Sequence, residues 1–119
     1  MTIDELRALC LSLPGSTEKE TWGDAEHAGD VTFRVRERIY VITGQTGGSA
    51  SIRTSAEEQA ELMDTFPMLF RRAPYTGRFG WVVVDLEKAD DALLTTVIVG
   101  AWRRTAPKAL VQAREEGRA

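Results

Sequence analysis

The chain has 119 residues, 43% of them hydrophobic, which suits one compact domain with one core, and we expect residues 1–119 to form it. A formal net charge of −3 and a pI near 5.2 exclude a general attraction to nucleic acid or to an anionic membrane, so any polyanion site must be local. The single cysteine excludes an internal disulfide and a cysteine-cluster metal site, and no apolar run approaches the roughly 18 residues of a membrane span. We therefore expect a cytoplasmic protein that has no membrane partner.

The first helix is predicted to begin after Thr2. Thr2 and Glu5 have the spacing of a capping box, in which the two side chains satisfy backbone N–H groups at the start of a helix. Apolar residues then recur at helical spacing until the Pro14-Gly15 pair ends the helix. They are Ile3, Leu6, Leu9, Cys10 and Leu13. Because Cys10 belongs to this face, we expect a buried thiol that packs like a small hydrophobic group and has no catalytic role.

Residues 16–30 are polar and predict a loop that leads into a first strand. His27, the only histidine of the chain, has no second histidine or cysteine nearby in the sequence. The carboxylates around it are spaced like a solvated edge and do not match a calcium loop. We therefore expect no metal site and no other cofactor.

Three strands are predicted between residues 31 and 53. Val31, Phe33 and Val35 alternate with polar residues, which is typical of a half-solvated antiparallel strand. A tight reversal leads to a returning strand at residues 39–42, and a glycine-rich turn then leads to a third strand at residues 49–53. This turn lacks the pattern of a phosphate-binding loop and precedes a strand, so we interpret it as a hairpin turn.

A second capped helix is predicted after the strands. Ser55 and Glu58 have the spacing of another capping box, and Pro67 ends the helix that follows them. A basic, glycine-punctuated loop at residues 71–80 then runs into a valine-rich strand at residues 82–86. We expect this loop and strand to contribute both to the fold and to any functional surface.

The chain ends with a third helix and a last short one. Asp90 or Asp91 caps the third helix, which carries a broad apolar stripe, and Pro107 opens the last. Links of hairpin length between the strands require antiparallel pairing, and the amphipathic helices need one face of that sheet to cover their apolar sides. We predict a two-layer α+β fold, in which the helices pack on one face of an antiparallel sheet.

Four segments, in this order, resemble the MmcQ/YjbR family, and the likeness covers nearly the whole chain. They are LPGS at residues 13–16, the FRVRERIY hairpin at residues 33–40, PYTGRFGWV at residues 74–82 and TAPKAL at residues 105–110. The resemblance implies a frataxin-like (CyaY-like) fold and a DNA-binding protein with a double-wing arrangement. The resemblance also implies that frataxins carry a dense acidic ridge on their first helix. This chain has only Asp4 and Glu5 there, so the resemblance does not extend to iron handling.

Basic and aromatic residues in the second half of the chain form the candidate nucleic-acid or anion site. Arginine forks pair well with phosphate oxygens, while tyrosine or tryptophan can stack on a base. The candidates are Arg71, Arg72, Tyr75, Arg78, Trp81, Arg103, Arg104 and Lys108. We identify no catalytic residue, because the only histidine lies in a polar loop and the only thiol on an apolar helix face. We therefore expect a non-enzymatic protein that binds DNA.

A binding module for a small anionic ligand or for a protein partner is the alternative. The same arginines, with backbone N–H groups near Gly77 and Gly80, suit one carboxylate or phosphate above an aromatic floor. The arrangement of the basic residues distinguishes the two hypotheses. A continuous stripe as wide as a duplex favours DNA, and two or three cations converging in a cleft favour the small ligand.

Overall fold

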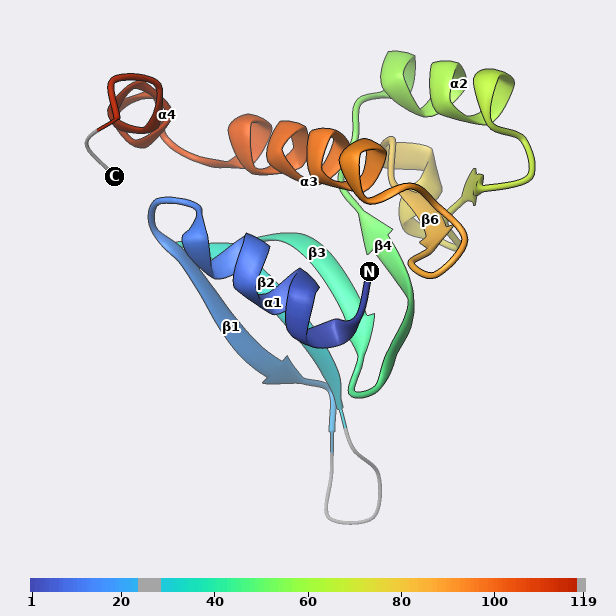
Figure 1. Cartoon of the computed structure of the whole chain (residues 1–119), viewed down its shortest axis with the longest axis horizontal. Helices are drawn as coiled ribbons and strands as arrows, with labels where there is room; N and C mark the ends of the chain where they lie inside the picture. The colour runs from blue at the N-terminus through green and yellow to red at the C-terminus, as the bar shows by residue number, and fades with distance from the viewer. Residues whose placement is uncertain (24–28, 118–119) are drawn as a thin grey trace.

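The computed structural model describes residues 1–23 and 29–117, which form one sheet with helices around it (Figure 1). The helices are α1 (Ile3–Ser12), α2 (Ala56–Thr65), α3 (Asp91–Thr105) and α4 (Lys108–Glu115), with a short 3₁₀ helix η1 (Thr76–Phe79). The strands are β1 (Ser16–Thr21), β2 (Asp30–Val35), β3 (Arg38–Gly44), β4 (Gly47–Ile52), β5 (Phe70–Arg72) and β6 (Val82–Asp85). They form one sheet in the order β1-β2-β3-β4-β6-β5, and every neighbouring pair is antiparallel.

Helices α1 and α3 cover one face of this sheet, which confirms the predicted two-layer α+β fold (Figure 1). Strand residues of alternating register, such as Phe33, Ile52 and Val82, are fully buried against the helices. A bulge in β3 turns Tyr40 toward the same core, where its hydroxyl lies 2.5 Å from the Ser16 hydroxyl. The Trp102 indole of α3 donates to the Pro14 carbonyl at 2.9 Å and so ties α3 to the end of α1.

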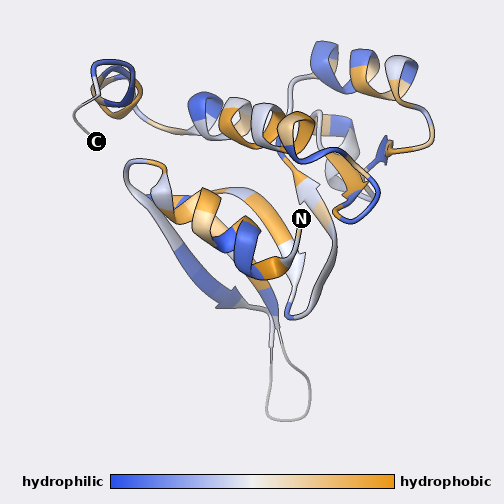
Figure 2. Ribbon diagram, in the orientation of Figure 1, coloured by the Kyte–Doolittle hydropathy of each residue, from blue (hydrophilic) through white to orange (hydrophobic). Residues whose placement is uncertain are grey.

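Residues 16–21, predicted as a loop, form the edge strand β1, so this prediction was wrong. Their sequence, STEKET, contains no apolar residue, and Figure 2 shows β1 as mainly hydrophilic. The strand exists because its backbone pairs with β2 along its full length, from Ser16 opposite Val35 to Thr21 opposite Asp30. Charged side chains on an edge strand also discourage pairing with another molecule, so polarity here is compatible with a strand.

Residues 71–72, predicted as part of a basic loop, belong to strand β5, which was the second missed strand. β5 is only three residues long, and its partner β6 supplies all of its sheet pairing. α2 packs beside it, since the rings of Phe66 and Phe70 lie 6.2 Å apart. A strand this short has too few residues for an alternating pattern, so tertiary pairing decides it.

The predicted helix starts are confirmed by their caps. The Glu5 N–H donates to the Thr2 hydroxyl at 3.1 Å, and the Thr2 N–H donates to the Glu5 carboxylate at 3.0 Å. Ser55 accepts from the Glu58 N–H at 3.0 Å, which is half of the predicted capping box, since the Glu58 carboxylate pairs with Arg104. The prediction for His27 and the carboxylates beside it lies outside the described residues.

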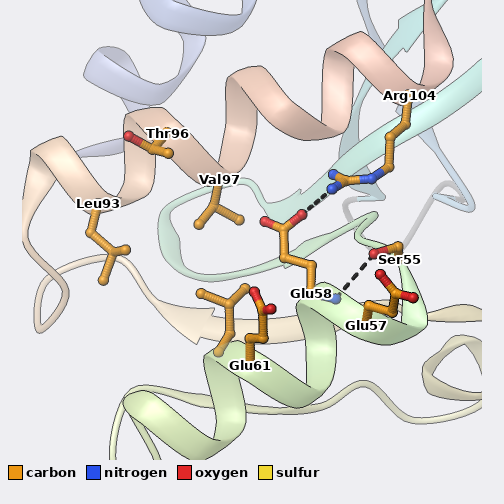
Figure 3. Close-up of a pocket in the computed structure, with 9 residues that line it drawn as sticks. Ser55, Glu57, Glu58, Glu61, Leu93, Thr96, Val97 and Arg104 are labelled. Atoms are coloured by element: carbon orange, nitrogen blue, oxygen red, sulfur yellow. Dashed lines mark hydrogen bonds and ion pairs between the residues drawn. The ribbon is translucent and has the colours of Figure 1, made fainter.

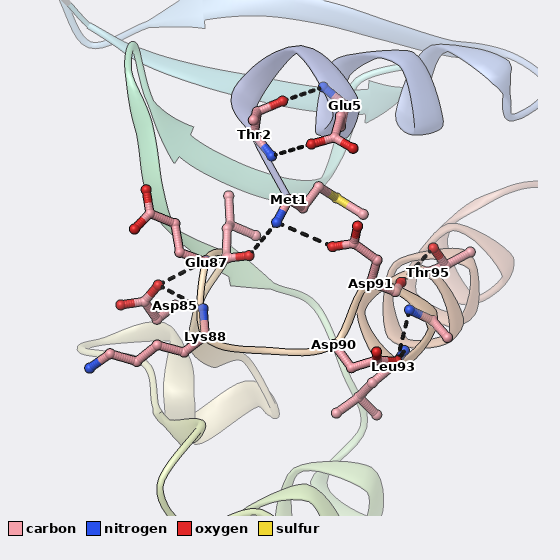
Figure 4. Close-up of polar contacts among 12 residues, drawn as sticks. Met1, Thr2, Glu5, Asp85, Glu87, Lys88, Asp90, Asp91, Leu93 and Thr95 are labelled. Carbon is pink, nitrogen blue, oxygen red and sulfur yellow. Dashed lines mark hydrogen bonds and ion pairs between the residues drawn. The ribbon is translucent and has the colours of Figure 1, made fainter.

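The start of α3 meets the amino end of the chain in a polar cluster (Figure 4). The Met1 amine donates to the Leu86 carbonyl at 2.5 Å and lies 3.2 Å from the Asp91 carboxylate. The Asp90 carboxylate accepts from the first backbone N–H groups of α3, and Asp85 accepts from those of the turn before it. These contacts fix how β6 passes into α3. No helix in the described part of the chain has the length and apolarity that a membrane crossing requires.

Cys10 is fully buried between α1 and the sheet, as predicted. Burial raises the pKa of its thiol from the ordinary 9.0 to about 12, and burial likewise raises the pKa of the nearby Tyr40 hydroxyl. The thiolate is the reactive form, so its population at pH 8 falls by roughly 1,000-fold.

We expect Cys10 in the folded protein to react with iodoacetamide at pH 8 at least about 100-fold more slowly than in denaturant, because the reactive thiolate is scarce and inaccessible. Mass spectrometry of timed samples measures both rates. Equal rates in the two conditions would contradict the burial of this thiol.

Candidate functional site

Residues 71–81 form a compact excursion from the edge of the sheet. β5 leads out of the sheet, η1 turns the chain, and β6 leads back. The excursion is closed at its base, where the Ala73 N–H donates to the Trp81 carbonyl at 3.2 Å, and inside it the Gly77 N–H donates to the Ala73 carbonyl at 2.9 Å. The basic and aromatic side chains of this segment are therefore carried by a fixed backbone.

Helix α2 holds this excursion in place. The Gln59 side-chain amide donates to two carbonyls of the excursion, those of Gly77 and Trp81, both at 2.8 Å. The Thr54 hydroxyl donates to the Gly80 carbonyl. Gly80 has φ +98° and comes so close to the start of α2 that a Cβ would lie 2.4 Å from the Thr54 carbonyl oxygen, so only glycine fits.

Tyr75 has a strained backbone and an exposed side chain. Its φ of +62° and ψ of −58°, with a 2.6 Å hydrogen bond from the Thr76 N–H to the Pro74 carbonyl, form a γ-turn of the rare positive-φ type. Its side chain is 94% exposed, so packing does not explain the strain. Strained residues of this kind are concentrated at functional sites, where the backbone is held to present a side chain.

Three arginines of this segment have no carboxylate partner among the described residues. Arg71, Arg72 and Arg78 form no ion pair or side-chain hydrogen bond among residues 1–23 and 29–117. Arg78 lies over the ring of Phe79, with 4.7 Å from its guanidinium carbon to the ring centroid, and Phe79 is 66% exposed. Five exposed residues of this segment make up what we call the β5–η1 surface, with Arg71 and Arg72 on opposite faces of β5 because Arg71 pairs with Val83 and Arg72 with Val82. They are Arg71, Arg72, Tyr75, Arg78 and Phe79.

Trp81, also a predicted site residue, lies beside this surface and is mostly buried. It is 9% exposed and packs with Ala73 and Val83, and with the half-buried Ile39 and Ile42, in a small cluster that contains no helix residue. Trp81 is therefore part of a floor and is not a freely stacking ring.

The other three predicted residues lie elsewhere. The end of α3 and α4 lie at the opposite end of the molecule from β5 (Figure 1). Arg103 pairs there with Glu115 of α4, and both line a pocket of about 490 Å³ together with Lys108. Arg104 pairs with Glu58 of α2. The eight predicted residues therefore do not form one continuous stripe.

Arg104 borders a pocket of about 320 Å³ between α2 and α3 (Figure 3). Three glutamates line it, Glu57, Glu58 and Glu61, over an apolar wall that includes Val97. One arginine facing three carboxylates leaves the pocket negative, so it repels polyanions. Among the described residues no group of three histidine, cysteine or acidic side chains is arranged to hold a metal ion.

Sequence reasoning missed the side chains that fix the site. Gln59 looked like an ordinary polar residue of a helix, and the γ-turn fell on a tyrosine, although positive φ is expected of glycine or asparagine. The PYTG sequence at residues 74–77 indicates a turn, but it does not indicate which type of turn forms. Gly77 lets the Arg72 side chain cross it, because a Cβ at this position would lie 2.3 Å from Arg72 Cγ.

Comparison with known proteins finds relatives that cover almost the whole fold. A family model described as YjbR matches residues 11–104. The crystal structure of the Deinococcus radiodurans protein DR2400, which carries a DUF419 domain, superposes with a TM-score of 0.75 at 25% sequence identity, over 98% of this chain and 88% of that one. No curated protein matches.

The strain at Tyr75 leads to a stability prediction. We expect Tyr75→Gly to raise the free energy of unfolding by about 1 kcal/mol relative to Tyr75→Ala, because glycine adopts positive φ without strain while both variants lose the same exposed ring. Urea denaturation measures both. A Tyr75→Gly protein no more stable than Tyr75→Ala would show that this turn stores no strain.

Proposed function

The chain belongs to the YjbR family, and we propose that it is a non-enzymatic DNA-binding protein that contacts phosphates through the β5–η1 surface. One observation carries the proposal. Three exposed arginines without a carboxylate partner in the described residues share one short segment with two exposed aromatic rings, of which Phe79 lies under Arg78, and α2 holds the backbone of that segment. Arginine with an exposed ring is the combination that binds a phosphate and an adjacent base.

The electrostatic contribution to DNA binding is local and small. The chain carries a net charge of −3, so the arginines act only at short range. Three phosphate contacts correspond to a log–log salt slope of about −2 for single strands and about −3 for a duplex. Binding is therefore expected to be weak at physiological salt and to strengthen at low salt.

A non-enzymatic role is supported by the buried thiol. The pKa of Cys10, about 12, keeps it protonated, and it faces the core. The β5–η1 surface contains arginines and aromatic rings but no general base.

The α3–α4 pocket favours a second candidate function, the binding of a small anion. Arg103 and Lys108 both line it, and Glu115 already pairs with Arg103. An anion would have to displace that carboxylate, which lowers its affinity. For this reason we rank it below the β5–η1 surface.

We expect Arg78→Ala to weaken oligonucleotide binding about five- to tenfold and to make the salt slope shallower by about one contact, because it removes one charge-assisted phosphate contact. Fluorescence anisotropy of labelled oligonucleotides at several salt concentrations measures both quantities. The free energy of unfolding should barely change, since Arg78 is exposed.

Arg103→Ala is the matched control. It removes the same charge from an arginine already paired with Glu115, and we expect the dissociation constant to change by less than about twofold. Absence of binding at low salt, or an equal loss in both variants, would contradict the proposed surface. Saturable binding of inorganic phosphate that Arg103→Ala abolishes would favour the second candidate.

A further inference from the structure

The face of the sheet opposite α1 and α3 carries a separate set of side chains. The small cluster around Trp81 lies on it and is built without helix residues. By strand alternation this face also carries Ser49 and Ser51 of β4, of which Ser49 is exposed. We call this surface the open face.

One register row crosses all six strands on the open face. The strand pairings place Arg71 opposite Val83, Val83 opposite Ser51, Ser51 opposite Ile42, Ile42 opposite Thr32, and Thr32 opposite Lys19. Its middle is apolar or hydroxylic, and each end is an exposed cation, Arg71 at β5 and Lys19 at β1. Five strand spacings of about 4.8 Å separate these ends, or about 24 Å.

On the open face the basic and acidic side chains lie at different ends of the strands. Arg34 lies in the next row, where its guanidinium donates to Thr32 at 3.1 Å and to Thr21 at 2.9 Å, with Glu37 at 3.9 Å. Its side chain is only 13% exposed, so it adds positive potential under the surface. The carboxylates Asp30 and Asp85 lie at the other strand ends, and Asp85 is occupied in capping a turn.

We propose that a single strand of nucleic acid crosses the open face along this row, from the β5–η1 surface to Lys19. The inference rests on the proposed function and extends it, since Arg71 belongs to both surfaces. Cations at the two ends complement the phosphates. The half-buried Ile39 and Ile42, with Trp81 and Val83 beneath, offer the bases an apolar floor.

A single strand fits this face better than a duplex does. Unpaired bases can turn toward the apolar floor and the exposed Tyr75 and Phe79 rings, and each base that does so contributes to binding. A duplex keeps its bases stacked inside, so a flat face meets only its phosphates, and two exposed cations about 24 Å apart give few contacts. No described helix presents a row of basic side chains to a major groove.

The test compares oligothymidylates of increasing length with a duplex, using fluorescence anisotropy on the full chain. We expect affinity to rise up to a length of about four to eight nucleotides and single strands to bind more tightly than the duplex. Ile42→Glu should weaken single-strand binding by at least about tenfold, because it places a carboxylate in the floor. Lys19→Ala should weaken it about threefold and make the salt slope shallower by about 0.7.

Two control variants make the same charge changes elsewhere. Leu11→Glu adds a carboxylate on the exposed side of α1, and Lys88→Ala removes an exposed lysine from the turn before α3. Neither should change the dissociation constant more than about twofold.

The outcomes separate this inference from the proposed function. Loss of binding in Arg78→Ala without an effect of Lys19→Ala, whose exposed position leaves the fold intact, would overturn the inference and leave the β5–η1 surface standing. Duplex binding as tight as single-strand binding would also overturn it. Absence of all oligonucleotide binding would overturn both the inference and the proposed function. An acidic peptide or a second copy of the chain bound to the open face in place of nucleic acid would do the same.

Discussion

The packing of α1 and α3 on a single face of the sheet is the interaction on which the rest of the structure depends. It buries the alternate residues of five strands together with Trp102, which accounts for most of the core. No helix residue takes part in the cluster on the opposite face, whose centre is a floor of Trp81 and Val83, with Arg71 opposite Val83 in the strand register. The same packing directs the acidic strand residue Glu18 toward α1, where Arg7 pairs with it at 2.6 Å. A chain with a net negative charge thereby keeps one face on which exposed cations and hydroxyl groups remain.

A second constraint explains why the candidate site projects from one edge of that sheet. Gln59 and Thr54 satisfy three carbonyls of the 71–81 excursion, so its backbone is fixed although few of its side chains are buried. These bonds hold Tyr75 in the γ-turn, which an isolated peptide would leave. The tyrosine ring therefore reaches solvent because α2 holds the backbone beneath it, and the site is organised before any ligand arrives.

The sequence allowed the fold class, the capped helices and the central strands to be predicted, because apolar periodicity and capping residues are local signals. β1 and β5 were missed, since an edge strand of polar residues and a strand of three residues are defined by their partners and not by their own pattern. Six basic residues were grouped because they lie in the second half of the chain, in segments that could converge, but Arg103 and Arg104 face carboxylates on other helices. Such pairings join residues 12 and 46 positions apart, and one sequence carries no sign of them.

Two-dimensional ¹H–¹⁵N NMR of the protein during titration with an oligothymidylate tests the central claim most directly. The three tryptophan indole N–H groups act as separate reporters, because Trp81 lies on the open face, Trp22 is exposed, and Trp102 is buried with its N–H bonded to Pro14. We predict that the Trp81 indole and the backbone amides of residues 71–83 shift with the titration, while the Trp102 indole stays in place. Shifts confined to α2, α3 and α4, with the Trp81 indole unchanged, would contradict the account.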